Sequence, residues 1–478
     1  MGESRKWWTL IGACSGLFVL MLDSTVVSLA LPSIRTDVGA DPAQLQWTMN
    51  VYLLTAAVLV VTAGRLGDMW GRKRMFVAGM VLFAVGSAFS GAAQDPNMLI
   101  GGRVLQGIGA AALVTLSLAL VCNAFPSEEQ PRALGVWAAV SAIALAIGPL
   151  VGGALIDLDW RLIFWINLPL IAIGAAIVLV AARESTDPGA GSRLDLPGLL
   201  TLTVGLTGLV LAMIQAQDWG AGWTTALIAA GLAMLGLFAW IERRASNPIV
   251  ELDLFRNGPY FGASAAAFTV VGAYWSLMFF QPQYLQDALG HSAILSGVLI
   301  LPVTVPMVVI SPFCGRLISR FGARRLMTFG VGSGVAGLLV LTQVDPGSPY
   351  GLALVGYLLF GIAIGLVYAP MSVAAMAAMP AEKVGIASGV LAMVRLVAGS
   401  LALAATGAAF RALLAGGDSF TASIAASNWV LVGLGVVGGI LTWVFVRDPE
   451  VPGPDPAVAG EPEPHALQHH AHHRRFHL

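Results

Sequence analysis

Charged residues are scarce in this chain of 478 residues, where Asp, Glu, Lys and Arg together make up 11% of the sequence. An ordinary soluble domain has roughly 25%, so the 57% of apolar residues here indicates a chain that lies in a lipid bilayer. The formal net charge of −1 leaves no basic excess to neutralise phosphates, which argues against a nucleic-acid partner. The three cysteines, Cys14, Cys122 and Cys314, fall in or beside apolar runs, so we expect packing residues rather than a disulfide framework.

Catalytic and nucleotide-binding motifs are also missing. The sequence contains no H-E-x-x-H, no G-x-S-x-G and no G-x-x-x-x-G-K-[ST], and His291 stands alone in a short loop. We therefore expect neither an enzyme nor an ATP-driven pump, and no cofactor or resident metal. The remaining histidines lie in a Pro- and Glu-rich segment at 448–478, which we expect to be a disordered cytoplasmic tail rather than a metal site: His465, His469, His470, His472, His473 and His477.

Hydrophobic segments of membrane-spanning length follow one another along most of the chain. A hydrocarbon core of about 30 Å needs roughly 20 helical residues. Charged, proline and glycine interruptions define fourteen such segments: 8–31, 47–66, 75–93, 98–121, 133–156, 162–182, 196–216, 223–241, 260–282, 294–314, 326–343, 350–371, 385–410 and 428–446. Arg5 and Lys6 precede the first segment, which is too long for the core of a signal peptide, so we expect it to be retained.

The distribution of Lys and Arg predicts the orientation of these spans. An even number of spans leaves both termini on one side, and basic residues concentrate on the cytoplasmic side of membrane proteins. With a cytoplasmic N-terminus, twenty basic residues fall inside, whereas the outer loops hold only Arg35, Arg161 and Arg411. The sequence therefore predicts a multi-pass protein of the cell membrane with both termini in the cytoplasm.

One carboxylate lies inside the first span. Asp23 is about eight residues, or ~12 Å, from the outer end of that span. An ionised side chain within a span costs on the order of 2.5 to 3.5 kcal/mol, so such residues face the bundle interior and often mark ion or proton pathways. We interpret Asp23 as a functional residue; the alternative is a carboxylate that only hydrogen-bonds a neighbouring helix.

An internal repeat divides the chain. Residues 64–74 (GRLGDMWGRKR) and 315–325 (GRLISRFGARR) align without gaps, after the second and the tenth span. This spacing predicts an all-α membrane protein with six, two and six spans: an N-terminal half at 1–185, two inserted helices with linkers at 186–258, and a C-terminal half at 259–447. Paired halves of this kind are typical of transporters, in which rocking opens a central site to each side alternately.

These residues resemble the major facilitator superfamily, and within it the fourteen-span drug:proton antiporters. The loop after the second span is similar to the superfamily's G-x-L-x-D-x-x-G-R-K signature at the following positions: Gly64, Asp68, Gly71, Arg72 and Lys73. The resemblance implies a conformational latch at the cytoplasmic face, with Asp68 paired to Arg72 or to a helix N-terminus. Ser319 stands at the Asp position of the second copy, so we expect only the first half to carry the charged latch.

The first and fourth spans carry two further motifs of this family. The stretch around Asp23 resembles its acidic motif, and Arg103-Val104-Leu105-Gln106-Gly107 resembles its R-x-x-Q-G motif. Arg103 lies about five residues, or ~8 Å, from the outer start of its span, which is a depth similar to that of Asp23. We expect the two to form an ion pair. Because arginine stays protonated, Asp23 must carry the coupling proton.

Two more segments complete the resemblance. The fifth span resembles the antiporter motif G-P-x-x-G-G, which is associated with exporters, at Gly148, Pro149, Gly152 and Gly153. Proline kinks a helix and glycines at this spacing admit a close neighbour, so the motif predicts a bendable, leak-tight seam. Residues 160–169 (WRLIFWINLP) resemble another family signature, which we interpret as an anchor at the outer membrane interface.

Aromatic and polar side chains within the spans are the candidates for substrate binding: Asn50, Tyr52, Gln106, Tyr274, Trp275, Phe279, Gln283, Tyr368 and Arg395. The alternative for the aromatic residues is contact with lipid or with a helix interface. Arg395 lies about ten residues into the thirteenth span, near mid-depth, where it contacts substrate or pairs with a helix C-terminus.

The sequence thus predicts a monomeric, proton-coupled antiporter that exports amphipathic small molecules, such as drugs, antibiotics and quaternary ammonium-like compounds, by alternating access. Its partners are its small-molecule substrate, protons and the lipid bilayer. The alternatives are a dedicated exporter of a metabolite or siderophore, an importer, and a non-transporting membrane sensor or scaffold. The charges of Asp23, Arg103 and Arg395 inside spans disfavour the scaffold, which would not need them.

Overall fold

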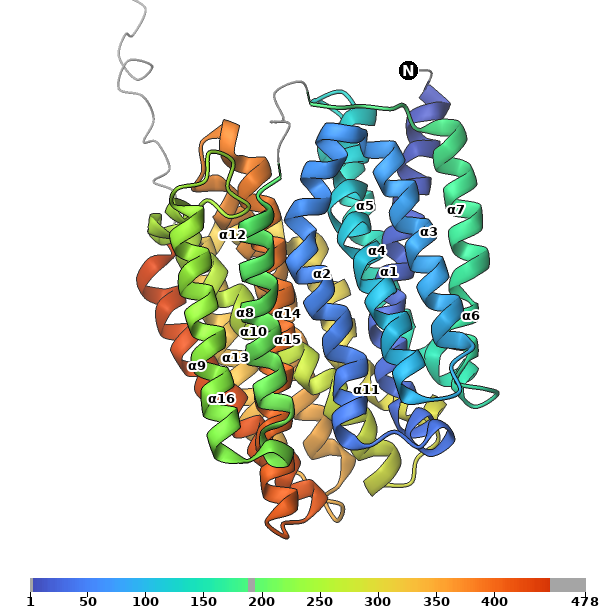
Figure 1. The fold of residues 1–478 in the computed structure, drawn as a ribbon, viewed down its shortest axis with the longest axis vertical. Coiled ribbons are helices and arrows are strands. Elements are labelled where there is room, and N and C mark those ends of the chain that lie inside the picture. Colours follow the sequence, from blue (N-terminus) through green and yellow to red (C-terminus); the bar gives the residue numbers. More distant parts are fainter. Residues whose placement is uncertain (1–2, 188–193, 448–478) are drawn as a thin grey trace, which may run out of the picture. The chain divides into compact units, whose positions relative to one another are not determined.

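The computed structural model describes residues 3–187 and 194–447, which form helices and their connecting loops (Figure 1). In these two ranges, fourteen helices are long and apolar enough to cross a membrane, as the sequence predicted. The predicted tail at 448–478 lies outside the described residues.

Sixteen α-helices build the described part of the chain. They are α1 (Glu3–Val38), α2 (Pro42–Trp70), α3 (Arg72–Gly91), α4 (Pro96–Ala124), α5 (Gln130–Ile156), α6 (Leu162–Trp165), α7 (Asn167–Ala181), α8 (Leu196–Ile214), α9 (Ala216–Glu242), α10 (Gly258–Gln283), α11 (Ala293–Ile310), α12 (Cys314–Phe321), α13 (Ala323–Leu341), α14 (Tyr350–Ala377), α15 (Val384–Ala415) and α16 (Phe420–Phe445). The pair α6 and α7 forms one span, as does the pair α11 and α12, and a π-helical turn at Tyr284–Ala288 extends α10.

Capping residues explain why several helices begin before their hydrophobic runs. Asp41 accepts a hydrogen bond from the backbone N–H of Gln44 at the start of α2, and the Gln44 side chain accepts one from the N–H of Asp41 in return. Ser419 caps α16, which therefore starts at Phe420 rather than at the predicted residue 428. Gly220 breaks the helical backbone near the start of α9 with a φ of 76°, so regular helix resumes close to the predicted start at 223.

The helices run between two faces of the bundle. We call the end where α1 begins and α2 ends the basic face (top in Figure 1), and the end where α1 finishes and α2 begins the opposite face. Within the described residues, the hydrogen bonds and ion pairs that join α1–α7 to α10–α16 lie in the half nearer the opposite face. They are Gln46 to Leu403 and Ala404, Asn50 to Ser400, Gln286 to Leu29, Arg35 to Asp287, and Ala293 to Asp157.

The helices α8 and α9 pack against each other and lie beside the seam between α2 and α15, since α8 contacts both of them. Arg65 at the end of α2 donates a hydrogen bond to the carbonyl of Asn247 in the loop after α9, over 3.2 Å. Lys383, before α15, donates to Glu251 in the same loop, over 2.5 Å. This hydrogen bond raises the pKa of Lys383 above its ordinary value.

The repeated loops adopt the same backbone turn. Gly71 separates α2 from α3 with a φ of 112°, and Gly322, at the equivalent position, separates α12 from α13 with a φ of 79°. Side chains other than glycine rarely adopt this region, so both copies need glycine at this point. The backbone therefore agrees with the sequence repeat.

Candidate functional site

The predicted ion pair between α1 and α4 is present. Arg103 Nη1 lies 2.6 Å from Asp23 Oδ2, and both side chains are 0% exposed. The Arg103 guanidinium also stacks 4.1 Å from the ring centre of Tyr52, and its Nε donates to the carbonyl of Thr48 over 3.2 Å. Three helices, α1, α2 and α4, thus meet around one neutralised pair of charges.

Two buried amides surround the Asp23 carboxylate. Gln106 Nε2 donates to Asp23 Oδ1 over 3.0 Å, and Asn167 Nδ2 donates to the same oxygen over 3.2 Å. Both amides also donate to Ser87 Oγ, over 2.8 Å and 3.1 Å. Gln106 in turn accepts from Arg103 Nη1 over 2.8 Å, so the ion pair belongs to a hydrogen-bonded cluster of α1, α3, α4 and α7.

This Asp23 cluster (Asp23, Ser87, Arg103, Gln106 and Asn167) retains unused bonding capacity. Arg103 Nη2 and Asn167 Oδ1 are buried and have no hydrogen-bond partner. An unpartnered buried polar atom costs about 1 to 3 kcal/mol, so these atoms favour any change that gives them a partner. A half-turn of the Asn167 amide would bring Oδ1 toward the Asp23 carboxyl group, where it could accept a hydrogen bond from the O–H of a protonated carboxyl.

Asn167 corrects the interpretation of residues 160–169 as an interface anchor. The Trp160 indole N–H donates to Asp37 over 3.1 Å, and Arg161 forms an ion pair with Asp37 at 2.7 Å. Trp160 is only 4% exposed, and Asn167 is 0% exposed and contacts Asp23. The sequence did hold a signal, since Asn167 is the only polar residue between Leu162 and Ala181. A single amide in an otherwise apolar span points inward for the same reason that Asp23 does.

The glycine motif of α5 lies in a tight seam. A Cβ added at Gly148 would lie 1.8 Å from Thr25 Oγ1 of α1, and one at Gly153 would lie 2.5 Å from the Cα atom of Ile294, beside the start of α11. Gly152 meets α1 one turn after Gly148. Only glycine permits these approaches, so α5 packs closely on α1 and α11 at once, near the opposite face.

The predicted latch residues join α2 and α3 to the end of α4. Arg72 lies 2.7 Å from Asp68, as expected, and also donates to Asn123 over 3.0 Å. Glu184 accepts hydrogen bonds from the backbone N–H groups of Lys73 and Arg74, over 2.9 Å and 3.1 Å. This carboxylate therefore caps the N-terminus of α3, a role that the sequence analysis missed because Glu184 is more than 100 residues away along the chain.

The second copy of the loop lacks the acidic partner. Ser319, at the position equivalent to Asp68, donates to the carbonyl of Arg316 within its own helix, over 2.9 Å. Arg324 stacks 4.0 Å from the ring centre of Trp443. The backbone turn is thus repeated, whereas the Asp–Arg pair occurs in the first copy only among the described residues.

Two of the substrate candidates line a cavity. Tyr274 and Tyr368 face an apolar cavity of about 30 Å³ between α5, α10, α11 and α14, and Arg395 lies 5.3 Å from the ring centre of Tyr368. Gln106 belongs to the Asp23 cluster. The others are buried in helix contacts: Asn50 against Ser400, Tyr52 under Arg103, Trp275 against Gly399, Phe279 against Phe280, and Gln283 on the carbonyl of Phe279.

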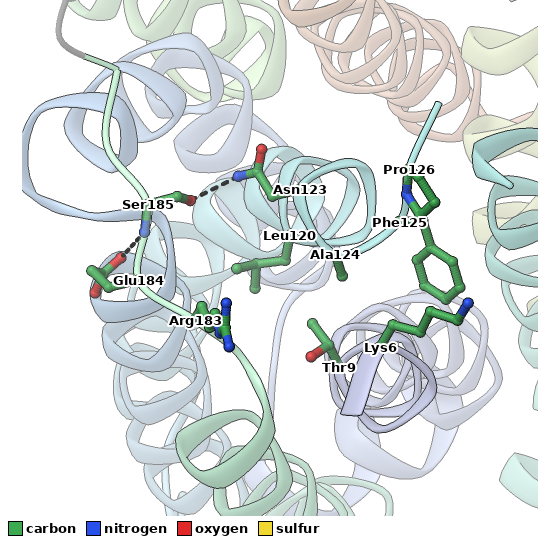
Figure 2. Close-up of a pocket in the computed structure, with 10 residues that line it drawn as sticks. All are labelled: Lys6, Thr9, Leu120, Asn123, Ala124, Phe125, Pro126, Arg183, Glu184 and Ser185. Carbon is green, nitrogen blue, oxygen red and sulfur yellow. Dashed lines mark hydrogen bonds between the residues drawn. The ribbon is translucent and has the colours of Figure 1, made fainter. Parts of the chain in front are cut away.

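A larger, polar cavity of about 620 Å³ opens at the basic face (Figure 2). Figure 2 shows that its walls come from the start of α1, the end of α4 and the segment after α7. Asn123 and Glu184, which take part in the latch contacts, belong to this wall. Lys6 comes from α1, and its ammonium points away from them toward Phe125 and donates to Glu129. In the described ranges, no three His, Cys, Asp or Glu side chains come together as metal ligands.

In the described part of the chain, fourteen apolar helices enclose this charged cluster, an arrangement that is typical of membrane transporters. The model of the Major Facilitator Superfamily matches residues 13–403, and the chain belongs to this superfamily of transporters, whose members are not enzymes.

Its relatives include proteins of drug and antibiotic resistance. The chain is 38% identical to the multidrug resistance protein Stp of Mycobacterium tuberculosis, over 81% of this chain and 72% of Stp. It is 32% identical to the tetracenomycin C resistance and export protein of Streptomyces glaucescens, over 81% and 73% of the two chains. It is 34% identical to a puromycin resistance protein of Streptomyces alboniger, over 81% and 78%.

Solved transporter structures share the fold. An inward-open structure of the xylose transporter XylE from E. coli aligns with a TM-score of 0.65 and 16% identity, over 93% of this chain and 97% of that chain. A POT family transporter aligns with a TM-score of 0.68 and 14% identity, over 94% and 98% of the two chains.

Proposed function

We propose that this chain is a proton-coupled antiporter that exports amphipathic small molecules, such as drugs and antibiotics, by alternating access. The Asp23 cluster is the observation that carries this proposal. Asp23 is the only carboxylate in the central part of a span within 3–187 and 194–447, which makes it the candidate for carrying a proton at that depth. Glu242, which is also buried, lies at the very end of α9. Relatives named for resistance and export support the direction of transport.

Protonation of Asp23 would redistribute the hydrogen bonds of its cluster. The neutral carboxyl loses its charge attraction to Arg103, while its new O–H group finds an acceptor in Asn167 Oδ1 once that amide turns. Arg103 keeps the carbonyl of Thr48, the amide of Gln106 and the face of Tyr52. Proton binding would therefore weaken the attraction between α1 and α4, while Arg103 keeps its contacts with Thr48, Gln106 and Tyr52.

Alternating access follows from the position of the contacts between the helices. We propose the predicted division into two six-span halves and two inserted helices, with the basic face and both termini in the cytoplasm. Because the bonds between α1–α7 and α10–α16 gather near the opposite face, this conformation is closed to the outside. The seam of α5 with α1 and α11 would open when the halves rock.

We propose that the latch pair Asp68–Arg72 shifts the equilibrium between the inward-facing and outward-facing states. Asp68 and Arg72 bind the α2–α3 loop to α4 and to the segment after α7 without reaching α10–α16. We propose that the pair favours the outward-facing state, in which the cytoplasmic ends of the two halves come together.

The experiment is proton release driven by substrate in proteoliposomes under an imposed pH gradient. Asp23→Asn keeps the shape and hydrogen bonding of the side chain but removes its proton site, so we expect coupled transport to be lost. The matched control is Asp253→Asn, which changes a carboxylate that is 82% exposed in a loop. If Asp23→Asn drives substrate uphill as fast as the wild type, the proposed coupling is wrong.

A further inference from the structure

A second arginine lies deep in the bundle without an acidic partner. Arg395 is about 17 Å along α15 from its start at Val384, roughly a third of the way along this span of 32 residues. Within 3–187 and 194–447 its guanidinium forms no ion pair and no hydrogen bond, and its contact is with the ring of Tyr368 at 5.3 Å. A partly buried cation at this depth is costly, and such residues often mark the path of a ligand or ion.

The neighbouring cavity is apolar and contains one unused donor. Tyr368 lines it together with Leu145 of α5, Tyr274 of α10 and Met307 of α11, so helices on both sides of the seam contribute. The hydroxyl of Tyr274 is buried and has no hydrogen-bond partner. At about 30 Å³ the cavity holds little more than one water molecule, and it gains room only when α5 moves away from α10, α11 and α14.

No acidic group balances this charge. In the described part of the C-terminal segment, the carboxylates between Gly258 and Ala415 are Asp287, Asp345 and Glu382, all at helix ends or in loops. Asp23 is 0% exposed and bound to Arg103, so it does not reach the cavity. The electrostatic potential around Tyr368 and Tyr274 is therefore positive, which attracts anions and repels cations.

We propose that the substrates are planar aromatic amphipaths that carry an anionic group, which Arg395 binds while the aromatic body stacks on Tyr368 and Tyr274. This proposal rests on the proposed export function and narrows it. A guanidinium forms two parallel hydrogen bonds with a carboxylate, and the free hydroxyl of Tyr274 supplies a third donor. Permanently cationic compounds, including quaternary ammonium compounds, are poor substrates because nothing in the cavity neutralises them.

The test compares two dyes with the same ring system and opposite charge, binding to the purified full-length protein. Fluorescein is an anionic xanthene and rhodamine 6G a cationic one, and fluorescence anisotropy reports the affinity of each. We expect fluorescein to bind at least tenfold more tightly to the wild type, since a hydrogen bond to a charged group is worth about 1.5 to 3 kcal/mol. Arg395→Gln should remove most of this preference, and Tyr274→Phe should reduce it by a smaller factor.

Matched variants separate the charge from its position. Arg395→Lys keeps the positive charge but not the planar pair of donors, so it should retain a reduced preference for fluorescein. Arg316→Gln removes an exposed arginine from α12 and should leave both affinities unchanged. Equal binding of both dyes to the wild type, or an unchanged fluorescein affinity in Arg395→Gln, would overturn the proposal.

Binding and transport give independent readouts. Failure of proton-coupled transport with intact selectivity between the dyes would contradict the antiport mechanism and leave the role of Arg395 standing. Coupled transport of rhodamine 6G at the rate of fluorescein would contradict the role of Arg395 in selecting anions and leave the antiport mechanism standing. A melting curve of each variant in detergent confirms that a lost affinity reflects the site and not the fold.

Discussion

The two arginines inside the spans, Arg103 and Arg395, have opposite surroundings. Arg103 is completely buried, bound to a carboxylate at 2.6 Å, an amide at 2.8 Å and a carbonyl at 3.2 Å. Arg395 is only partly buried and stacks on a tyrosine beside an apolar cavity. A charge inside a membrane is energetically costly for both residues. For Arg103, bonds to other groups of the same chain offset this cost, whereas Arg395 has no acidic partner among the described residues.

Because of this difference, we expect the surroundings of Arg103 and those of Arg395 to have different functions. Arg103 is already bound to a carboxylate, an amide and a carbonyl, and only its Nη2 lacks a partner, so its cluster has little to offer a large ligand. Arg395 lacks an acceptor, and a ligand can supply one. We therefore propose that the Asp23–Arg103 pair serves proton coupling and that Arg395, which has no internal acidic partner among the described residues, serves the selection of ligands.

Among the substitutions at the two arginines and their neighbours, replacing Arg103 should have the largest effect on stability and transport. Arg103→Gln leaves Asp23 buried without its counter-ion, which costs about 3 to 5 kcal/mol of stability. The apparent melting temperature in detergent should fall sharply, and coupled transport should disappear. The measurement is a melting curve alongside proton release from proteoliposomes.

A double variant tests whether Arg103→Gln is destabilising because Asp23 loses its counter-ion or because the packing of the helices is disturbed. Asp23→Asn with Arg103→Gln removes both charges, so most of the stability should return while proton coupling stays absent. A double variant no more stable than Arg103→Gln alone would show that Asp23 is not what the arginine stabilises.

Replacing Asn167 should have an intermediate effect. Asn167→Ala removes hydrogen bonds to Asp23 and Ser87, each worth about 0.5 to 1.5 kcal/mol, and deprives a protonated Asp23 of its acceptor. We expect a moderate loss of melting temperature together with reduced proton release per substrate transported.

The chain offers a matched control for this variant. Asn428 is also a buried asparagine, 3% exposed, but its Nδ2 has no hydrogen-bond partner. Asn428→Ala should cost less stability than Asn167→Ala and leave the proton-to-substrate ratio unchanged. An equal loss of coupling in both variants would argue that Asn167 has no special part in the Asp23 cluster.

Depth along a helix could be predicted from the sequence, but rotation around it could not. The ion pair between Asp23 and Arg103 followed from counting residues along α1 and α4, because helical rise fixes the level of each side chain. Tyr52 and Asn167 were assigned to a pocket and to an interface, yet both pack within the Asp23 cluster. Membrane helices are apolar all round, so no polar stripe shows which side faces the interior.

Contacts between segments that lie far apart along the chain could not be predicted from the sequence either. The turn at Gly71 could be anticipated from the repeat, whereas the cap that Glu184 places on α3 depends on how the chain returns after α7. Tyr274 and Tyr368 were named among many aromatic residues, and the structure brings these two to one cavity because α10 and α14 pack together. Packing between helices decides such contacts, and the local pattern of residues does not encode it.

Replacing Arg395 should have the smallest effect on stability. Arg395→Gln breaks no ion pair and leaves no buried group without a partner, so only its contact with Tyr368 is lost, at a cost of about 0.5 to 1 kcal/mol. The melting temperature should stay close to that of the wild type, in contrast to Arg103→Gln measured in the same detergent. Comparable destabilisation by the two variants would mean that Arg395 also has an internal partner, and the distinction between the two arginines would then fail.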